Sequence, residues 1–241
     1  LIDDNKLKEK YATKQPYGEW LDNNLIKLED LKIPNKKVPA HTKEERARLQ
    51  KAFGYTYEDF RTSILPMALN GSESIGAMGI DTPLAVLSNR HQPLFNYFKQ
   101  LFAQVTNPPI DSIREKIVTS TTVYLGKDGN ILEEQPENCK NLKINNPILT
   151  NTDLLKIKNM KVEGFKVETI PITYYKNTSL EKAIDHLFVE VDRAHREGTN
   201  IVILSDRGVD ENHVAIPSLL AVGAVQHYLV QTKKRTSMAV I

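Results

Sequence analysis

The last third of the sequence alternates between short apolar runs and helical patterns, and this alternation limits the possible folds more than any other feature. The predicted elements, in chain order, are a strand at 165–172, a helix from the capping pair Thr178 and Glu181 to Gly198, a strand at 201–204, a helix at 217–230 and a strand at 238–241. This order predicts a parallel βαβαβ sheet covered by helices. The fold class is therefore α/β.

The first two thirds of the chain predict an N-terminal helical region, one β-hairpin and irregular segments. The capping pairs Thr42–Glu45 and Thr56–Asp59 each predict the start of a helix. The predicted elements are helices at 42–53 and 57–69, the second bent at Pro66, a helix at 94–105, a hairpin at 121–132 around the turn at 127–130, an irregular stretch at 133–150 and a short helix at 151–158.

Residues 1–41 differ from the rest in composition. They are polar and rich in lysine, and Pro16, Pro34 and Pro39 interrupt any long helix. We expect an entry segment here that lies on another surface, followed by one domain over residues 42–241. The chain starts at Leu1 rather than at Met, which suggests a piece of a longer polypeptide.

Composition and charge make several classes of protein poor first hypotheses. The formal net charge of +2 creates no long-range field for a nucleic acid, and no run approaches the ~18 apolar residues of a membrane span. The single cysteine, Cys139, cannot form an internal disulfide or a multi-cysteine metal site. We therefore expect a cytoplasmic chain with neither a nucleic-acid nor a membrane partner.

The segment 205–213 follows a predicted buried strand, where parallel sheets usually bind ligands. Asp206, Asp210 and His213 could form a metal or phosphoryl site there. The alternative is that Asp206 pairs with Arg207 while residues 210–212 cap the next helix, and this second interpretation is favoured because carboxylates are common before helices.

Other motifs give no convincing catalytic set. The glycine-rich stretch 71–79 has Ala77 and Met78 where a phosphate-binding loop needs Lys and Ser or Thr, so a close backbone approach is the better use of its glycines. No two histidines have the i, i+4 spacing of a helical zinc site. Cys139 lies in a polar segment without an activating partner in the sequence, apart from its neighbour Lys140.

Three long runs closely resemble the central domain of glutamate synthase. They are MGIDTPLAVLS at 78–88, FNYFKQLFAQVTNPPID at 95–111, and ILSDRGV at 203–209 with AIPSLLA at 215–221. The similarity extends over about residues 15–241. The sequence departs from the family pattern at Ala77, His91, Ser112 and Gln226, which puts in doubt only contacts at domain junctions.

The resemblance implies a connecting domain of a larger enzyme. That enzyme joins a glutamine amidotransferase domain, this α/β domain (likened to a degenerate relative of the barrel), and an FMN-binding barrel with a 3Fe-4S cluster. It makes glutamate from glutamine and 2-oxoglutarate with electrons from an NAD(P)H-oxidising small subunit or from ferredoxin. The cofactors belong to the adjacent domain, so no catalytic, cofactor or metal residue is expected in this chain.

The resemblance also implies a site residue by residue. Gly76, Met78, Gly79, Asp81 and Thr82 lie in the loop where the family's domains meet, so we expect them at the wall of the ammonia channel and at the contact with the barrel. A tight turn before Pro83 explains the same residues without any channel. Two other hypotheses also remain: a stand-alone α/β enzyme that uses Asp206, Asp210 and His213, and a non-catalytic binding scaffold.

Overall fold

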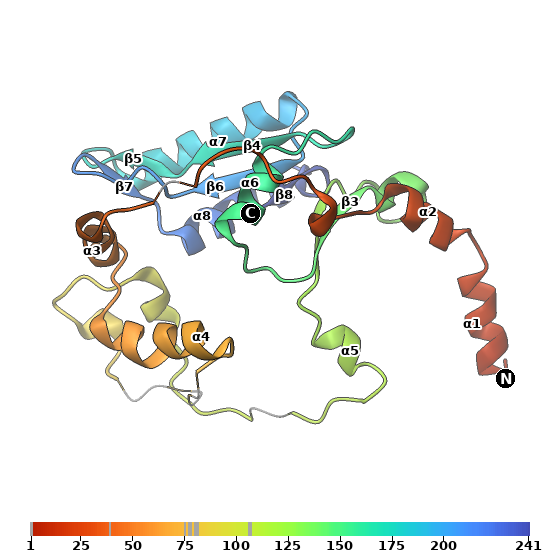
Figure 1. Cartoon of the computed structure of the whole chain (residues 1–241), viewed down its shortest axis with the longest axis horizontal. Coiled ribbons are helices and arrows are strands. Elements are labelled where there is room, and N and C mark those ends of the chain that lie inside the picture. The colour runs from red at the N-terminus through yellow and green to blue at the C-terminus, as the bar shows by residue number, and fades with distance from the viewer. Residues whose placement is uncertain (1, 39, 75, 77–78, 80–81, 106–107) are drawn as a thin grey trace. The chain divides into compact units, whose positions relative to one another are not determined.

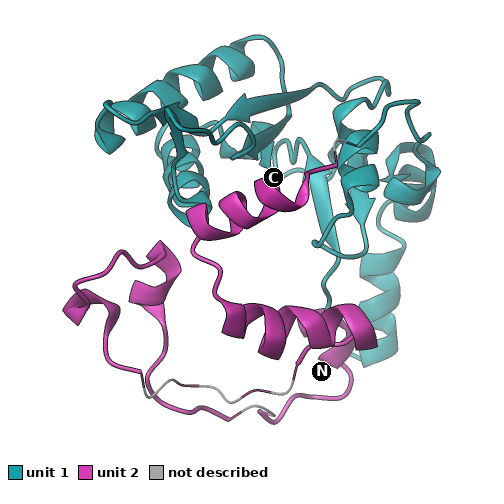
Figure 2. Cartoon of the chain, turned by 60° about the vertical axis from the view of Figure 1, so that its left-hand side comes forward, with its two compact units in different colours: residues 1–38, 120–241 teal, residues 39–119 magenta. Residues whose placement is uncertain are grey.

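The computed structural model describes residues 2–38, 40–74, 76, 79, 82–105 and 108–241. The chain divides into two compact units (Figure 2). Unit 1 comprises residues 1–38 and 120–241, and unit 2 comprises residues 39–119. The boundary expected at residue 42 stays a prediction, and each unit is described separately below.

Unit 1 is built on a three-stranded parallel sheet (Figure 1). Its strands are β4 (Val167–Pro171), β6 (Ile201–Ser205) and β8 (Ala239–Val240), in the order β4-β6-β8. Thr169 pairs with Ile203, and Val202 pairs with Val240. The predicted parallel βαβαβ unit and the α/β class are confirmed, and the described residues form no closed barrel.

Helices α7 (Leu180–Arg196) and α8 (Ser218–Gln231) connect these strands and cover one face of the sheet. The predicted apolar side of α7 is confirmed, because Ala183, Leu187, Val191 and Ala194 are all buried. The predicted capping pair was wrong by one residue. Ser179 caps the helix by accepting from the N–H of Lys182, while the N–H of Thr178 is used in a turn to Tyr175.

The other face of the sheet carries a second core that the sequence analysis only partly foresaw. Helix α6 (Asn151–Lys158) has the predicted bounds and packs there with a small mixed sheet of order β1-β3-β2. These strands are β1 (Ile26–Lys27), β2 (Val123–Gly126) and β3 (Asn141–Ile144). Leu28 and Leu31, from the short 3-10 helix η1 (Leu28–Asp30) and the residue after it, complete this core.

The predicted hairpin was wrong in its second strand. β2 pairs antiparallel with β3, so the segment 133–150, predicted to be irregular, supplies the central strand of the small sheet. Leu142 in β3 is fully buried, whereas Leu132 is 90% exposed. The loop that joins β2 and β3 is held elsewhere, since the N–H groups of Asp128 and Gly129 donate to the carbonyl of Thr236.

The remaining elements of unit 1 lie at its ends. They are helices α1 (Asp4–Ala12) and α2 (Tyr17–Asn24), the 3-10 helices η5 (Pro136–Cys139) and η6 (Arg235–Ser237), and a two-stranded antiparallel sheet of β5 (Thr173–Tyr175) and β7 (His213–Ala215). Neither β5 nor β7 was predicted. No described helix is long and apolar enough to cross a membrane.

Unit 2 begins with two helical segments that the sequence predicted. Helix α3 (Lys43–Ala52) has the reciprocal capping box of Thr42 and Glu45. The next segment runs through a π-helical stretch, η2 (Asp59–Ile64), into α4 (Leu65–Asn70). Pro66 has no N–H to donate. Just before it the helix is wound as a π-helix, in which the N–H of Leu65 donates to the carbonyl of Phe60, five residues earlier.

The helix predicted at 94–105 was wrong. Only the 3-10 helix η4 (Leu94–Phe98) forms, after a shorter one, η3 (Ala85–Leu87), and the chain continues in extended form from Lys99. An amphipathic helix of this length is stable only when its apolar face is packed. In the structure Phe102 is 82% exposed, so that packing is absent here. A short helix α5 (Glu115–Val118) closes the unit.

Candidate functional site

The expected site, the loop of residues 76–82, lies in unit 2 and is described only in part. Gly76 and Thr82 are exposed, and Gly79 is half-buried. Met78 and Asp81 lie outside the described residues, so their expected role stays a prediction.

Gly79 makes a close backbone contact that no other residue type could make without strain. Its φ is +89°, and a Cβ built on it would lie 2.9 Å from the backbone nitrogen of Ala103 and from the carbonyl carbon of Phe102. A Cβ on Gly76 would meet nothing within 4 Å. Among the described residues, the close approach expected of the glycine-rich stretch is therefore found at Gly79 and not at Gly76.

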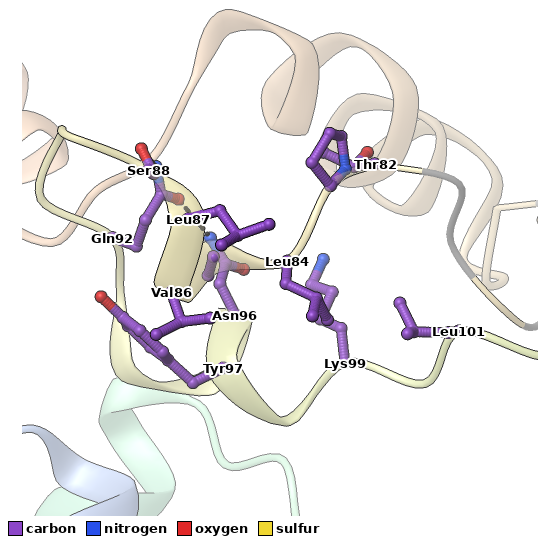
Figure 3. A pocket seen from close by; sticks show the side chains of 12 residues that line it. Thr82, Leu84, Val86, Leu87, Ser88, Gln92, Asn96, Tyr97, Lys99 and Leu101 are labelled. Carbon is purple, nitrogen blue, oxygen red and sulfur yellow. Dashed lines mark hydrogen bonds between the residues drawn. The ribbon is translucent and has the colours of Figure 1, made fainter.

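A pocket of about 450 Å³ opens beside Thr82 (Figure 3). Its walls come from the segments around η3 and η4, and Leu84, Val86, Leu87 and Tyr97 are among the lining side chains that Figure 3 labels. The sequence analysis did not single these residues out. The available signal was the run Pro83–Leu87, which is apolar but has neither the helical nor the strand period.

Polar side chains form a short hydrogen-bonded chain at one side of the pocket. The amide of Gln92 donates to Oγ of Ser88 over 3.3 Å, and the amide of Asn96 donates to Oε1 of Gln92 over 3.1 Å. Lys99 is the one charged residue among the twelve described lining residues. Among the described lining residues, no carboxylate, imidazole or thiol accompanies Lys99, and the largely apolar lining suits the binding of apolar groups.

The apolar surface extends beyond the pocket. No described residue of unit 2 is buried, although the unit is rich in large apolar side chains. Those exposed by more than two thirds are Leu69, Val86, Leu87, Phe98, Phe102, Val105, Ile113 and Ile117, with Tyr57. Exposed apolar side chains gathered in this number are typical of an interaction surface.

The alternative site at Asp206, Asp210 and His213 is only partly brought together. Oδ1 of Asp210 accepts from the N–H of Asn212 and from the N–H of His213, each over 2.8 Å, and lies 2.9 Å from Nδ1 of His213. These contacts hold the pKa of Asp210 below its usual value, with the N–H of Asn212 as the largest cause. No hydrogen bond or ion pair recorded for the described residues joins Asp206 to either partner.

The second interpretation of this segment was also wrong in detail. Arg207 donates to Oδ1 of Asn151 over 2.6 Å and forms no recorded pair with Asp206. Residues 210–212 precede strand β7 rather than a helix, so they shape a turn and cap nothing. Within the described ranges, no group of three His, Cys, Asp or Glu side chains could hold a metal ion.

The fold defines an α/β domain, and its described residues include an exposed apolar loop surface. Residues 48–241 match the family model of the glutamate synthase central domain. The chain therefore belongs to the glutamate synthase family, as its central domain, and the resemblance seen in the sequence is confirmed.

Relatives in several organisms agree with this assignment. The chain is 39% identical over 244 residues to the glutamate synthase [NADPH] large chain of Bacillus subtilis. It is 38% identical to the glutamate synthase [NADH] of Schizosaccharomyces pombe and 39% identical to a ferredoxin-dependent glutamate synthase of Synechocystis. All of this chain is covered in each comparison, but it spans only 16%, 12% and 16% of these relatives' lengths.

Proposed function

We propose that this chain is the connecting domain of a glutamate synthase, which links a glutamine amidotransferase domain to an FMN-binding synthase domain and helps to enclose the ammonia that passes between them. The observation that carries the proposal is the surface of unit 2, where large apolar side chains are exposed and no described residue is buried. Covering apolar surface is worth about 25 cal/mol per Å². Flanking domains of the same polypeptide supply that cover.

The parent enzyme forms glutamate from glutamine and 2-oxoglutarate, as an oxidoreductase of glutamate biosynthesis in the cytoplasm. Its electron donor is an NAD(P)H-oxidising small subunit or ferredoxin; the names of the relatives give NADPH, NADH and ferredoxin for those proteins. A 3Fe-4S cluster does not fit this chain, because one cysteine cannot supply three thiolates. We therefore assign the cluster to the adjacent domain, and FMN with it, as the family resemblance implies.

The role of the junction loop follows from its chemistry. Ammonia is small and neutral in the form that moves through a protein interior, so a passage for it needs close backbone packing rather than charge. The contact of Gly79 with residues 102–103 supplies such packing, and Thr82 at the pocket edge offers a hydroxyl. The arrangement at Asp210 and His213 is explained by the turn before β7, which supports a connector over a stand-alone enzyme.

Leu87→Lys in the full-length polypeptide is expected to lower glutamine-dependent glutamate formation at least about tenfold. Leu87 lines the pocket and is 73% exposed in this chain, so a flanking domain that covers it would have to bury an unpaired charge. The measurement is glutamate formation beside glutamine hydrolysis. Asn89→Lys, which adds the same charge at an exposed neighbour, is the control, and equal effects of the two variants would count against the proposal.

The isolated chain is expected to bind no FMN and to release no ammonia from glutamine. The described pocket walls include no carboxylate, imidazole or thiol, and the one cysteine, Cys139, is half-buried. Absorbance near the flavin bands after purification with added FMN, and an ammonia assay with glutamine, test this directly. A stoichiometric yellow complex would contradict the assignment, as would glutaminase activity that is lost in His213→Ala.

A further inference from the structure

The end of helix α4 places an asparagine directly before a glycine. Asn70 is the last residue of α4, and Gly71 follows it with a φ of +62°. Asn70 is the only asparagine in the sequence that precedes a glycine. In such a pair the glycine nitrogen can approach the amide carbon of the asparagine side chain, because the glycine has no Cβ to hinder it. Whether the two atoms react depends on how firmly the structure holds them.

Two other helices show how an asparagine at a helix end is held. Asn24 ends α2, and its side-chain amide donates to the carbonyl of Trp20 over 2.8 Å. Asn159 follows α6, and its amide donates to the carbonyl of Leu155 over 2.8 Å. Both of these asparagines are half-buried. Asn70 is exposed, and its amide has no recorded hydrogen bond to any residue that the structure describes. Its side chain can therefore turn toward the backbone.

The backbone nitrogen of Gly71 is held only by the last turn of a short helix. Its N–H donates to the carbonyl of Met67 over 3.0 Å, and this bond must open before the nitrogen can react. α4 has six residues, and none of them is buried. Helix ends without packing open at little cost in free energy. A Cβ built on Gly71 would meet no described residue within 4 Å, so there is room for a ring at this position.

We propose that Asn70 is a site of spontaneous deamidation. The backbone nitrogen of Gly71 gives its proton to water and bonds to Cγ of Asn70, while the bond from Cγ to Nδ2 breaks and the amide nitrogen leaves as ammonia. Water then opens the five-membered succinimide at one of its two carbonyls, which leaves aspartate or isoaspartate at position 70. The reaction consumes only water, and the inference does not rest on the proposed function.

The products change the end of α4 in two ways. Each adds a negative charge at the C-terminal end of the helix, where the helix dipole disfavours it, and three residues before Glu73. Isoaspartate also lengthens the backbone by one methylene group. Deamidation should therefore weaken the last turn of α4, where the chain enters the glycine-rich stretch 71–79.

Peptide mapping of the full-length polypeptide by mass spectrometry tests the proposal. The native polypeptide and a synthetic peptide of residues 65–76 are kept at neutral pH, and the conversion of Asn70 is followed over time by the mass gain that replaces an amide nitrogen with oxygen. Digestion in heavy-oxygen water marks any deamidation that occurs during sample preparation. We expect Asn70 in the native polypeptide to react within about tenfold of the rate in the peptide, because a helix end without packing opens easily.

Two controls separate this chemistry from general ageing of the protein. Asn24 also ends a helix, but it precedes leucine and its amide is bonded, so we expect it to stay unmodified in the same samples. Gly71→Ala should slow the reaction at Asn70 at least about tenfold, because the added Cβ hinders the attack. A rate more than tenfold below that of the peptide, or an unchanged rate in Gly71→Ala, would overturn the proposal.

Discussion

Leu142→Ala is expected to lower the free energy of unfolding of the 241-residue chain by about 2–5 kcal/mol, as large-to-small substitutions in a packed core do. Leu142 is fully buried in β3, the central strand of the small sheet, where it pairs with Ile26 of β1 and Leu125 of β2. Its side chain contributes to the core between that sheet, α6 and the main parallel sheet. Alanine would leave a cavity that three surrounding layers cannot close.

Leu132→Ala is the matched control, because it removes the same atoms from a side chain that is 90% exposed. We expect its effect to stay within about 0.5 kcal/mol, as at most surface sites. Urea unfolding followed by circular dichroism measures both variants. The hairpin that the sequence predicted would reverse the order, since it places 131–132 in a strand and leaves 142 in an irregular segment. A larger loss for Leu132→Ala would therefore contradict the strand pairing described above.

Gly79→Val in the full-length polypeptide is expected to reduce the glutamate formed per glutamine hydrolysed at least about tenfold. Valine is strained at a φ of +89°, and its Cβ would lie 2.9 Å from the backbone of residues 102 and 103, so the two segments must separate. If they help to enclose ammonia, the separation opens the passage to water. The loss should then appear in the coupling of the two reactions, while glutamine hydrolysis continues.

Two comparisons distinguish an opened ammonia channel from a folding defect as the cause of the loss in Gly79→Val. Added ammonia should restore glutamate formation in Gly79→Val if the synthase site is intact. Gly76→Val introduces the same side chain where a Cβ meets none of the described residues within 4 Å, so an effect of that variant, seen only in the full-length polypeptide, would support a wall contributed by another domain. Unchanged coupling in Gly79→Val would count against the channel, and a loss that ammonia cannot restore would indicate a folding defect.

Segments were predicted well where the apolar residues of the sequence pattern are the ones buried in the structure. The apolar stripe of α7 and the uninterrupted run of β6 correspond to a helix on a sheet and to a strand covered on both faces. The short strand β3 was not predicted, because its four residues are too few to show the alternation of a strand. Its burial also depends on β1, which lies more than a hundred residues earlier in the chain. The predicted helix at 94–105 failed for the opposite reason: its period was clear, but its apolar side chains, such as Phe98 and Phe102, stay largely exposed and no core forms around them among the described residues.

For the candidate site, too, the sequence indicated the segment but not the contacts that its residues make. The family resemblance pointed to the loop at 76–82, yet it could not distinguish Gly79, which lies against the backbone of residues 102–103, from Gly76, where a Cβ would meet none of the described residues within 4 Å. It also pointed to no pocket, because Leu87 and Tyr97 come together only through the path of the chain between η3 and η4.

By itself the sequence determined the α/β class, the parallel order of the last three strands and the family, because local periodicity and long exact runs need no knowledge of distant contacts. Only the tertiary structure decided which apolar residues are core and which are surface. Burial depends on what lies opposite a side chain: Leu142 is enclosed between the small sheet, α6 and the main sheet, whereas Leu219 and Leu87, equally apolar, are 54% and 73% exposed.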